Sequence, residues 1–105
     1  MEHLFVSFKV KKNKVHEAKS AIRKFVDEIT RKEPGTVIYN CYQEKSDDTS
    51  FIHTMTFESE KAEEHHRHTV YVKEFVNKLY PICEEEPVFT ELNMICSNKS
   101  AQFEQ

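Results

Sequence analysis

The sequence predicts an α+β domain with the ferredoxin-like element order β-α-β-β-α-β, in which an antiparallel sheet carries both helices on one face. Apolar and polar residues alternate in four short segments, as they do in strands whose two faces differ. Apolar residues recur at helical spacing in two longer segments, one after the first strand and one after the third. The chain has 105 residues, which is enough for one hydrophobic core.

The first strand and the first helix have the clearest patterns. Residues 3–11 are predicted to be a strand because every second side chain is apolar: Leu4, Val6, Phe8 and Val10. Asn13 is expected to cap the long amphipathic helix that follows. The apolar positions of this helix are Val15, Ala18, Ile22, Phe25, Val26 and Ile29. Pro34-Gly35 then ends the helix and turns the chain.

The middle of the chain predicts two strands joined by a loop. Residues 36–45 are rich in β-branched and aromatic side chains, which favours a strand. The polar run 46–50 has hairpin potential, and residues 51–58 alternate again.

The second helical region is expected to run from about residue 60 to residue 83. Ser59 is positioned to cap it, and Glu63 lies near the capping-box position. Residues 69–72, Thr-Val-Tyr-Val, form a poor helical run, so we expect a kink or a break there.

The last part of the chain predicts a fourth strand at 88–95 and a polar tail at 97–105, with Phe103 as the residue expected to dock. One domain would therefore cover residues 1–96. The second face of the sheet also carries apolar side chains, which need cover. We therefore expect a homodimer, with two-fold symmetry as the simplest arrangement.

The composition excludes several classes of protein. A net charge of −3 and a pI near 6.1 argue against general binding to nucleic acid. No apolar run is long enough to cross a membrane, and no signal peptide is evident, so a cytoplasmic protein is expected. The three cysteines show no metal-binding spacing and are expected to be reduced thiols. The single glycine, Gly35, rules out the glycine-rich loops that bind dinucleotides or triphosphates.

Residues 33–42, Glu-Pro-Gly-Thr-Val-Ile-Tyr-Asn-Cys-Tyr, resemble the E-P-G-x-x-x-Y-x-x-Y segment of antibiotic biosynthesis monooxygenase (ABM) domains. The resemblance implies a dimeric α/β-barrel. It also places Ala62 and His66 at the alanine and first histidine of the family's helix, Tyr71 at its second histidine and Phe75 at the next aromatic residue. The family includes cofactor-independent oxygenases of phenols and quinols, haem-degrading enzymes and an autoinducer-processing isomerase. The chain departs from the haem-degrading branch, since it has no tryptophan.

The resemblance and the residue chemistry together predict a catalytic set. His66 is the candidate general base, with Asn40 and Tyr71 as orienting groups. Three further residues are candidates for substrate binding: Tyr39, Ser7 and His53. Only one of Tyr39 and Asn40 can face a given side of the sheet, because neighbours on a strand point in opposite directions.

The activity expected from these residues is cofactor-independent monooxygenation of a small aromatic or carbonyl substrate, with no metal and no other cofactor. The alternatives are an isomerase of a small molecule and a non-catalytic ligand-binding or interaction module on the same fold. His65 and His68, with Glu64 nearby, could hold a zinc ion on one helix face. A solvated polar helix face explains them better, and a packing role for His66 is the alternative to the catalytic one.

Overall fold

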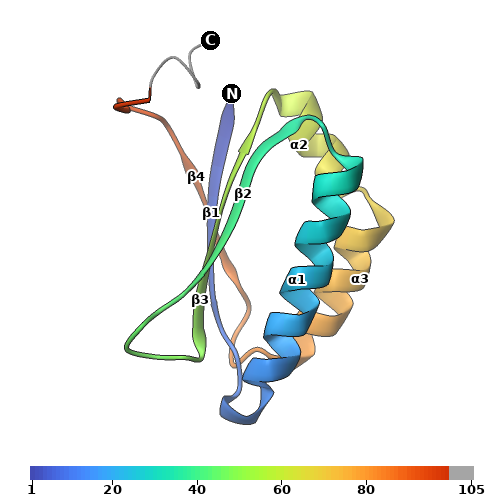
Figure 1. The fold of residues 1–105 in the computed structure, drawn as a ribbon, viewed down its shortest axis with the longest axis vertical. Coiled ribbons are helices and arrows are strands. Elements are labelled where there is room, and N and C mark those ends of the chain that lie inside the picture. The colour runs from blue at the N-terminus through green and yellow to red at the C-terminus, as the bar shows by residue number, and fades with distance from the viewer. Residues whose placement is uncertain (100–105) are drawn as a thin grey trace.

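The computed structural model describes residues 1–99, and the order of its elements is the predicted one. These elements are β1 (Glu2–Lys9), the 3-10 helix η1 (Lys12–Lys14), α1 (Val15–Lys32), β2 (Thr36–Gln43), β3 (Ser50–Phe57), α2 (Glu60–Arg67), α3 (Val70–Leu79), the 3-10 helix η2 (Tyr80–Ile82) and β4 (Val88–Leu92). The strands form one antiparallel sheet in the order β2-β3-β1-β4. All three α-helices lie on one face of it (Figure 1). The ferredoxin-like prediction for the single chain is thus confirmed.

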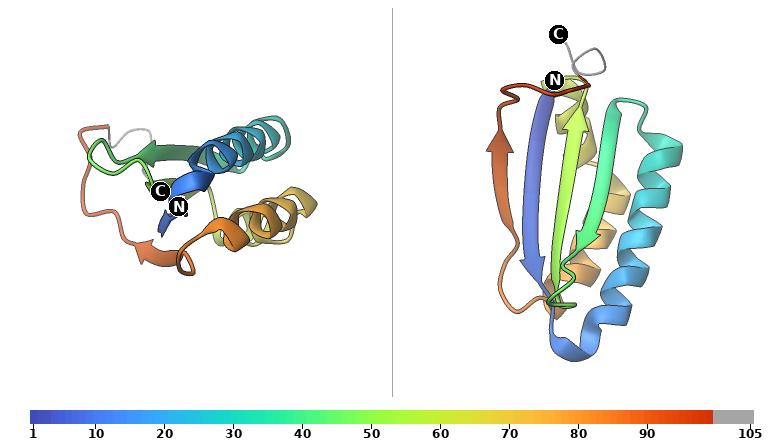
Figure 2. Two further views of the ribbon diagram at one scale, coloured as in Figure 1. Left: turned by 90° about the horizontal axis from the view of Figure 1, so that it is seen from below. Right: turned by 60° about the vertical axis from the view of Figure 1, so that its left-hand side comes forward.

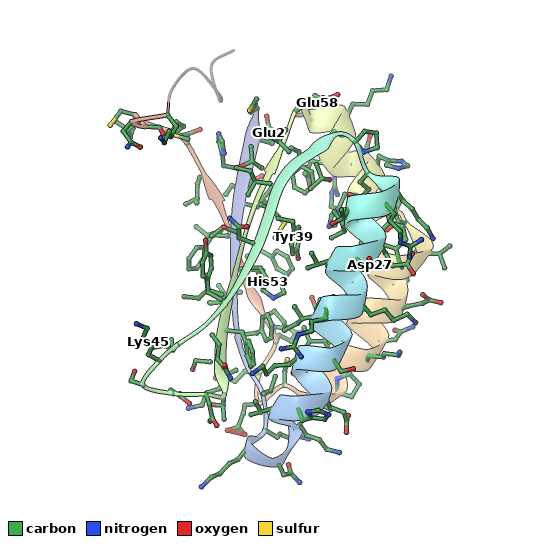
Figure 3. All side chains as sticks on the ribbon, in the orientation of Figure 1. Glu2, Asp27, Tyr39, Lys45, His53 and Glu58 are labelled. Carbon is green, nitrogen blue, oxygen red and sulfur yellow. The ribbon has the colours of Figure 1, made fainter. Side chains whose placement is uncertain are left out.

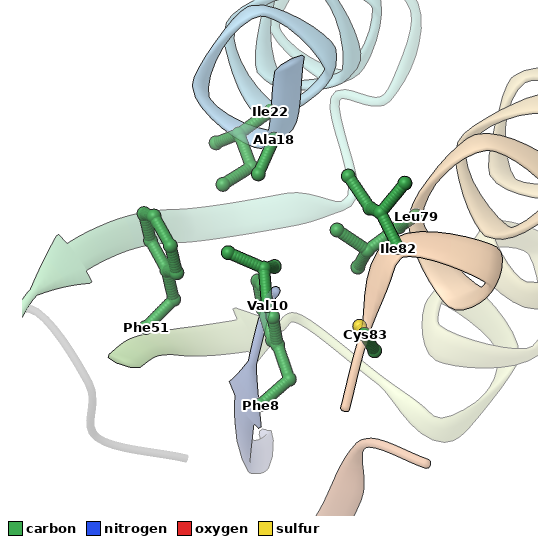
Figure 4. Close-up of a cluster of buried hydrophobic side chains, with 8 residues drawn as sticks. All are labelled: Phe8, Val10, Ala18, Ile22, Phe51, Leu79, Ile82 and Cys83. Atoms are coloured by element: carbon green, nitrogen blue, oxygen red, sulfur yellow. The ribbon is translucent and has the colours of Figure 1, made fainter. Parts of the chain in front are cut away.

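The hydrophobic core lies between the sheet and the helices. The predicted stripe of α1 faces inward, with Ala18, Ile22, Phe25 and Ile29 buried. Figure 4 shows part of this layer, where Ile22 and Ala18 of α1 approach Phe8 of β1, Val10 just after β1 and Phe51 of β3. Each large apolar side chain buried in this way contributes about 1.5–3 kcal/mol to folding.

The two faces of the sheet follow the alternation along each strand. β1 pairs with β3 so that Val6 lies opposite His53, and β3 pairs with β2 so that His53 lies opposite Cys41. These side chains face the helices, because Tyr39, two residues before Cys41, packs edge-on against Phe25 of α1. The opposite face of the sheet, called the open face below, carries no helix (Figure 2).

Side chains on the open face include Phe5, Ile38, Tyr42, Ile52, Val88 and Leu92. Tyr42, Val88 and Leu92 are 53%, 61% and 45% exposed. The apolar second face predicted from the sequence is therefore present in the single chain, and it has no cover among residues 1–99.

Two predicted helix caps are corrected. Asn13 does not cap α1: it lies inside η1, and the N-cap is Lys14, whose side chain makes no capping hydrogen bond. The Lys14 N–H instead donates to the carbonyl of Lys11, which closes the 3-10 turn. Glu63 does not complete a capping box, because its carboxylate pairs with Arg67 at 2.7 Å, one turn further along α2.

The second helical region breaks where the β-branched run predicted a break. α2 ends at Arg67, and Thr69 caps α3 by accepting a hydrogen bond from the Val72 N–H. Ser59 caps α2 as predicted, accepting a hydrogen bond from the Ala62 N–H.

The C-terminal predictions are met only in part. β4 ends at Leu92, earlier than predicted, and only β1 pairs with it among the described residues. Phe103 lies outside the described residues, so its docking and the boundary of the tail stay predictions. Among residues 1–99, no helix is both long enough and apolar enough to cross a membrane.

Candidate active site

A cavity of about 500 Å³ lies between the sheet and helices α2 and α3. Most of its wall is apolar: Leu4, Val6, Phe8, Met55, Phe57, Val72, Phe75, Val76 and Leu79. Three polar side chains from the core also line it, namely Tyr39, His53 and His66. Its lining also includes Arg67, His68 and Phe89, which are exposed, so the cavity meets solvent beside these residues. A concave apolar site with a few polar groups is typical of small-molecule binding.

His66 lies in the last turn of α2, and only 7% of it is exposed. Its ring packs against Phe57, with a centroid distance of 5.1 Å, and against Phe25 at 5.8 Å. The Nδ1 atom of His66 lies 2.8 Å from Oε1 of Glu33. His66 is therefore a core histidine with a buried carboxylate partner, and it also lines the cavity.

Glu33 is the C-cap of α1 and is 5% exposed. Besides His66, its carboxylate accepts a hydrogen bond from the Thr36 hydroxyl at 2.7 Å and another from the Tyr71 hydroxyl. Burial alone would raise the pKa of the Glu33 carboxyl, but these hydrogen bonds and the nearby imidazole together lower it. Glu33 is therefore ionised at neutral pH, and an ionised carboxylate can only accept. The Nδ1 atom of His66 must carry the hydrogen, which leaves Nε2 as the basic nitrogen.

Gly35 allows α2 to approach this carboxylate. A Cβ atom on Gly35 would lie only 2.8 Å from the Cβ of Ala62, which is shorter than any normal contact. Ala62 lies one turn before His66 on α2. The small side chains at positions 35 and 62 therefore set the distance between the turn that carries Glu33 and the helix that carries His66.

Tyr71, in the first turn of α3, is linked to the imidazole of His66 through the carboxylate of Glu33. Its hydroxyl donates to Oε2, while His66 binds Oε1 of the same carboxylate. Burial and the bond to Glu33 raise the pKa of Tyr71, so the hydroxyl keeps its proton. Tyr71 orients the carboxylate, and it is absent from the cavity lining.

His53 and Tyr39 form a second polar pair in the cavity wall. The Tyr39 hydroxyl lies 3.1 Å from Nδ1 of His53, and Figure 3 shows both side chains in the layer between the sheet and α1. Burial lowers the pKa of His53 to about 4, so its imidazole is neutral. Burial also raises the pKa of Tyr39 well above its usual value.

Asn40 and Ser7 do not lie with the other candidates. Asn40 pairs with Thr54, and Ser7 pairs with Ile52, so both side chains point to the open face. The choice between Tyr39 and Asn40 that the sequence left open is thus resolved: Tyr39 faces the cavity.

His65 and His68 do not point to one common site, since His68 borders the cavity and His65 borders a depression beside Gly35. No cluster of three or more His, Cys, Asp or Glu side chains within residues 1–99 could hold a metal ion.

Glu33 is the site residue that the sequence did not single out. It stands first in the E-P-G motif, where Pro34 and Gly35 attract attention as turn residues. The sequence did contain one signal. The C-terminal end of a helix carries a partial negative charge, which favours basic side chains and disfavours an acidic one. An acidic residue at this position therefore indicates a contact outside the helix, and here the carboxylate of Glu33 binds His66 and Tyr71.

Comparisons with known proteins agree with this architecture. The family model described as antibiotic biosynthesis monooxygenase matches residues 1–78. The uncharacterized protein sll1783 of Synechocystis sp. is 33% identical over 72 residues, which cover 69% of the chain. The chain spans about half the length of this relative, 48% of it.

Two of the similar solved structures are candidate antibiotic biosynthesis monooxygenases. The one from Nitrosomonas europaea has a TM-score of 0.85 and 21% identity, over 91% of this chain and 100% of that one. The one from Caulobacter crescentus CB15 has a TM-score of 0.84 and 21% identity, over 90% and 89%. At this level of identity the two structures show a shared fold and nothing more.

Proposed function

The chain belongs to the antibiotic biosynthesis monooxygenase family, and from that premise we propose that it is a cofactor-independent monooxygenase of phenols or quinols. The observation that carries the proposal is the pairing of His66 with the buried, ionised Glu33 at the wall of an apolar cavity. The family alone supports a monooxygenase-like role. The substrate class and the mechanism below are our proposal.

The first step is removal of a phenolic proton by Nε2 of His66. The proton leaves the substrate hydroxyl, and the imidazole becomes a cation that Glu33 stabilises through the Nδ1 hydrogen bond. The apolar wall limits contact with water, which strengthens this electrostatic stabilisation. The product of the step is an electron-rich phenolate in an apolar cavity.

The second step is reaction of the phenolate with molecular oxygen. One electron passes from the phenolate to oxygen, and the resulting radical and superoxide combine to form a carbon–oxygen bond at a ring carbon that carries a hydrogen, opposite the hydroxyl in a phenol and next to it in a quinol. The peroxide then loses its outer oxygen as water, taking up the hydrogen of that carbon and the phenolic proton held by His66. One phenol and one O₂ therefore give one quinone and one H₂O, and no external reductant is needed.

The cavity favours this proposal over a purely structural module. About 500 Å³ of space remains between the sheet and the helices, although the rest of the core is closely packed. An interaction module would have no use for such a space next to a buried pair of a carboxylate and an imidazole.

The test is oxygen uptake with a panel of phenols, hydroquinones and anthrones. We expect at least one compound to consume one O₂ per molecule of quinone formed, with no hydrogen peroxide released and no metal or flavin added. If a compound that binds is isomerised without oxygen uptake, the base is supported but the monooxygenase is not. If no compound that binds is changed, the chain is a ligand-binding module.

We also propose a homodimer formed through the open face. Its support is the exposure of Tyr42, Val88 and Leu92 on a sheet face without a helix. A cytoplasmic location fits the three free cysteines, Cys41, Cys83 and Cys96.

A further inference from the structure

The proposed mechanism uses His66 but gives no role to the other buried histidine of the cavity, His53. His53 is 1% exposed, and its Nε2 atom is buried with no hydrogen-bond partner among residues 1–99. A buried polar nitrogen without a partner is costly and uncommon in a folded protein. The wall of the cavity therefore contains an unused hydrogen-bonding group.

The partners of His53 determine whether this nitrogen donates or accepts. The Tyr39 hydroxyl has one hydrogen, and among the described residues its one partner is Nδ1 of His53. If the hydroxyl donates to Nδ1, the hydrogen of the imidazole is on Nε2 and only that group is unpaired. If Nδ1 donates instead, both the Tyr39 hydrogen and the Nε2 lone pair are unpaired, which is worse. His53 therefore offers an N–H donor.

The two buried histidines of the cavity are opposite in character. His66 offers a lone pair, since Glu33 fixes its hydrogen on Nδ1, and His53 offers a hydrogen. Their rings pack near the same Tyr39 ring, at centroid distances of 6.0 Å and 5.5 Å. One ligand of about two rings is therefore able to contact both.

We propose that His53 donates a hydrogen bond to a carbonyl oxygen of the ligand, so that the cavity selects aromatic molecules that carry both a hydroxyl group and a carbonyl group. A carboxylate is a poor candidate, because a neutral imidazole within an aromatic shell would leave its charge unpaired. Phe8 and Phe75 flank the imidazole, at centroid distances of 5.1 Å and 6.2 Å, and both also line the cavity. Because Nε2 is itself buried, the proposal requires one of these side chains to rotate when the ligand binds.

This inference rests on the proposed function in taking the cavity as the ligand site, but it does not depend on oxygen chemistry. The test is therefore equilibrium binding by calorimetry under nitrogen, with three probes of similar size. Para-hydroxybenzophenone has both groups, para-benzylphenol lacks the carbonyl, and benzophenone lacks the hydroxyl. We expect the wild-type chain to bind the first probe about fivefold more tightly than para-benzylphenol, the effect of one neutral hydrogen bond.

The variant His53→Phe keeps a ring in the aromatic shell and removes the donor. We expect it to lose the preference for the carbonyl, so that para-hydroxybenzophenone and para-benzylphenol bind equally, while the preference for the hydroxyl over benzophenone remains. His16→Phe, the same exchange at an exposed histidine of α1 outside the cavity lining, is the matched control and should retain both preferences. The inference is overturned if His53→Phe keeps the carbonyl preference, or if the wild-type chain lacks it or binds none of the probes.

A measurement on the wild-type chain covers the case in which His53→Phe does not fold. NMR of protein with isotopically labelled histidine identifies which nitrogen carries the hydrogen. We expect it on Nε2 of His53, with an N–H resonance that moves on addition of para-hydroxybenzophenone and stays in place with para-benzylphenol. A hydrogen on Nδ1, or equal responses to both probes, would overturn the inference. If the chain shows this binding selectivity but converts no substrate, the proposed monooxygenase activity fails and the inference about His53 stands.

Discussion

Glu33 and His66 are 33 positions apart in the chain, yet Oε1 of the carboxylate lies 2.8 Å from Nδ1 of the imidazole in the interior of the domain. The first residue ends α1 and the second lies in the last turn of α2. Burial of such a pair is unfavourable unless its hydrogen bonds are complete, and Thr36 and Tyr71 complete those of the carboxylate. A pair maintained in this way beside a cavity is typical of a functional site rather than of packing alone.

The first prediction concerns the base. His66→Gln keeps a side chain of similar length that can still donate to Glu33, but it has no basic nitrogen. On a substrate that the wild-type chain converts, we expect kcat to fall ~10²–10⁴-fold, the usual contribution of a general base. Thermal unfolding monitored by circular dichroism should show a folded variant.

The control for this prediction is His65→Ala, because His65 borders a different depression and not the cavity. It should retain kcat within a factor of about two, as a surface change that touches no site residue. His68 is a poorer control, since it lines the exposed side of the cavity. Equal losses in His66→Gln and His65→Ala would remove His66 from the mechanism.

The second prediction concerns the carboxylate. Glu33→Gln keeps the size of the side chain but removes the charge that stabilises the imidazolium, so kcat should fall while the KM of the substrate changes little. Tyr71→Phe removes one hydrogen bond to the same carboxylate and should produce a smaller loss of kcat. Steady-state kinetics on both variants measures the two effects. A larger effect in Tyr71→Phe than in Glu33→Gln would contradict the order of roles proposed here.

The third prediction tests the close contact between α2 and the turn after α1. Gly35→Ala places a Cβ atom 2.8 Å from that of Ala62, so we expect a loss of about 1–3 kcal/mol in the free energy of unfolding. Adding Ala62→Gly removes the clash and should recover part of this loss, although glycine in a helix costs about 1 kcal/mol by itself. Urea unfolding of the four proteins gives the coupling energy. Additive effects would show that the contact does not limit the approach of α2.

The spacing of apolar residues predicted the elements of this fold, because a helix or strand that buries one face repeats apolar side chains at its own period. The stripe from Ala18 to Ile29 and the alternation from Leu4 to Val10 face the core as expected. Alternation alone could not decide between Tyr39 and Asn40, since both faces of β2 carry apolar residues. That choice is made by Phe25 on another element, which packs on Tyr39.

The site was less predictable than the fold, because it too depends on contacts between different elements. His66 lies in a polar stretch, Glu-Lys-Ala-Glu-Glu-His-His-Arg, which suggests a solvated helix face, yet it is buried. Its burial depends on contacts with Phe57 and Glu33, which are distant in the chain. Pairings of this kind come from the packing of elements, and local patterns in the sequence do not specify them.

The fourth prediction concerns assembly. Light scattering during size exclusion should give about twice the chain mass of 12.5 kDa, because the apolar open face needs cover. Tyr42→Glu places a charge on that face and should shift the protein toward the monomer. Val70→Lys, at a residue on α3 that is 70% exposed, is the control and should leave the mass unchanged. A wild-type monomer at micromolar concentration would contradict the proposal of a dimer.

The fifth prediction is a pH dependence of stability that comes from His53. Burial lowers its pKa in the folded chain to about 4, whereas an unfolded histidine titrates near 6.5. Between these values the unfolded chain binds more protons than the folded chain, so the free energy of unfolding must decrease as the pH falls through this window. The expected loss in the free energy of unfolding is about 3 kcal/mol from neutral pH to pH ~4, at 1.36 kcal/mol per pH unit.

Urea unfolding at a series of pH values measures this loss, with His53→Phe as the comparison. The variant lacks the titrating group, so its stability curve should be flatter over this window, while the exposed His16→Gln should follow the wild type. Parallel curves for His53→Phe and the wild-type chain would mean that His53 binds its proton equally well in the folded and the unfolded chain, which would contradict the lowered pKa.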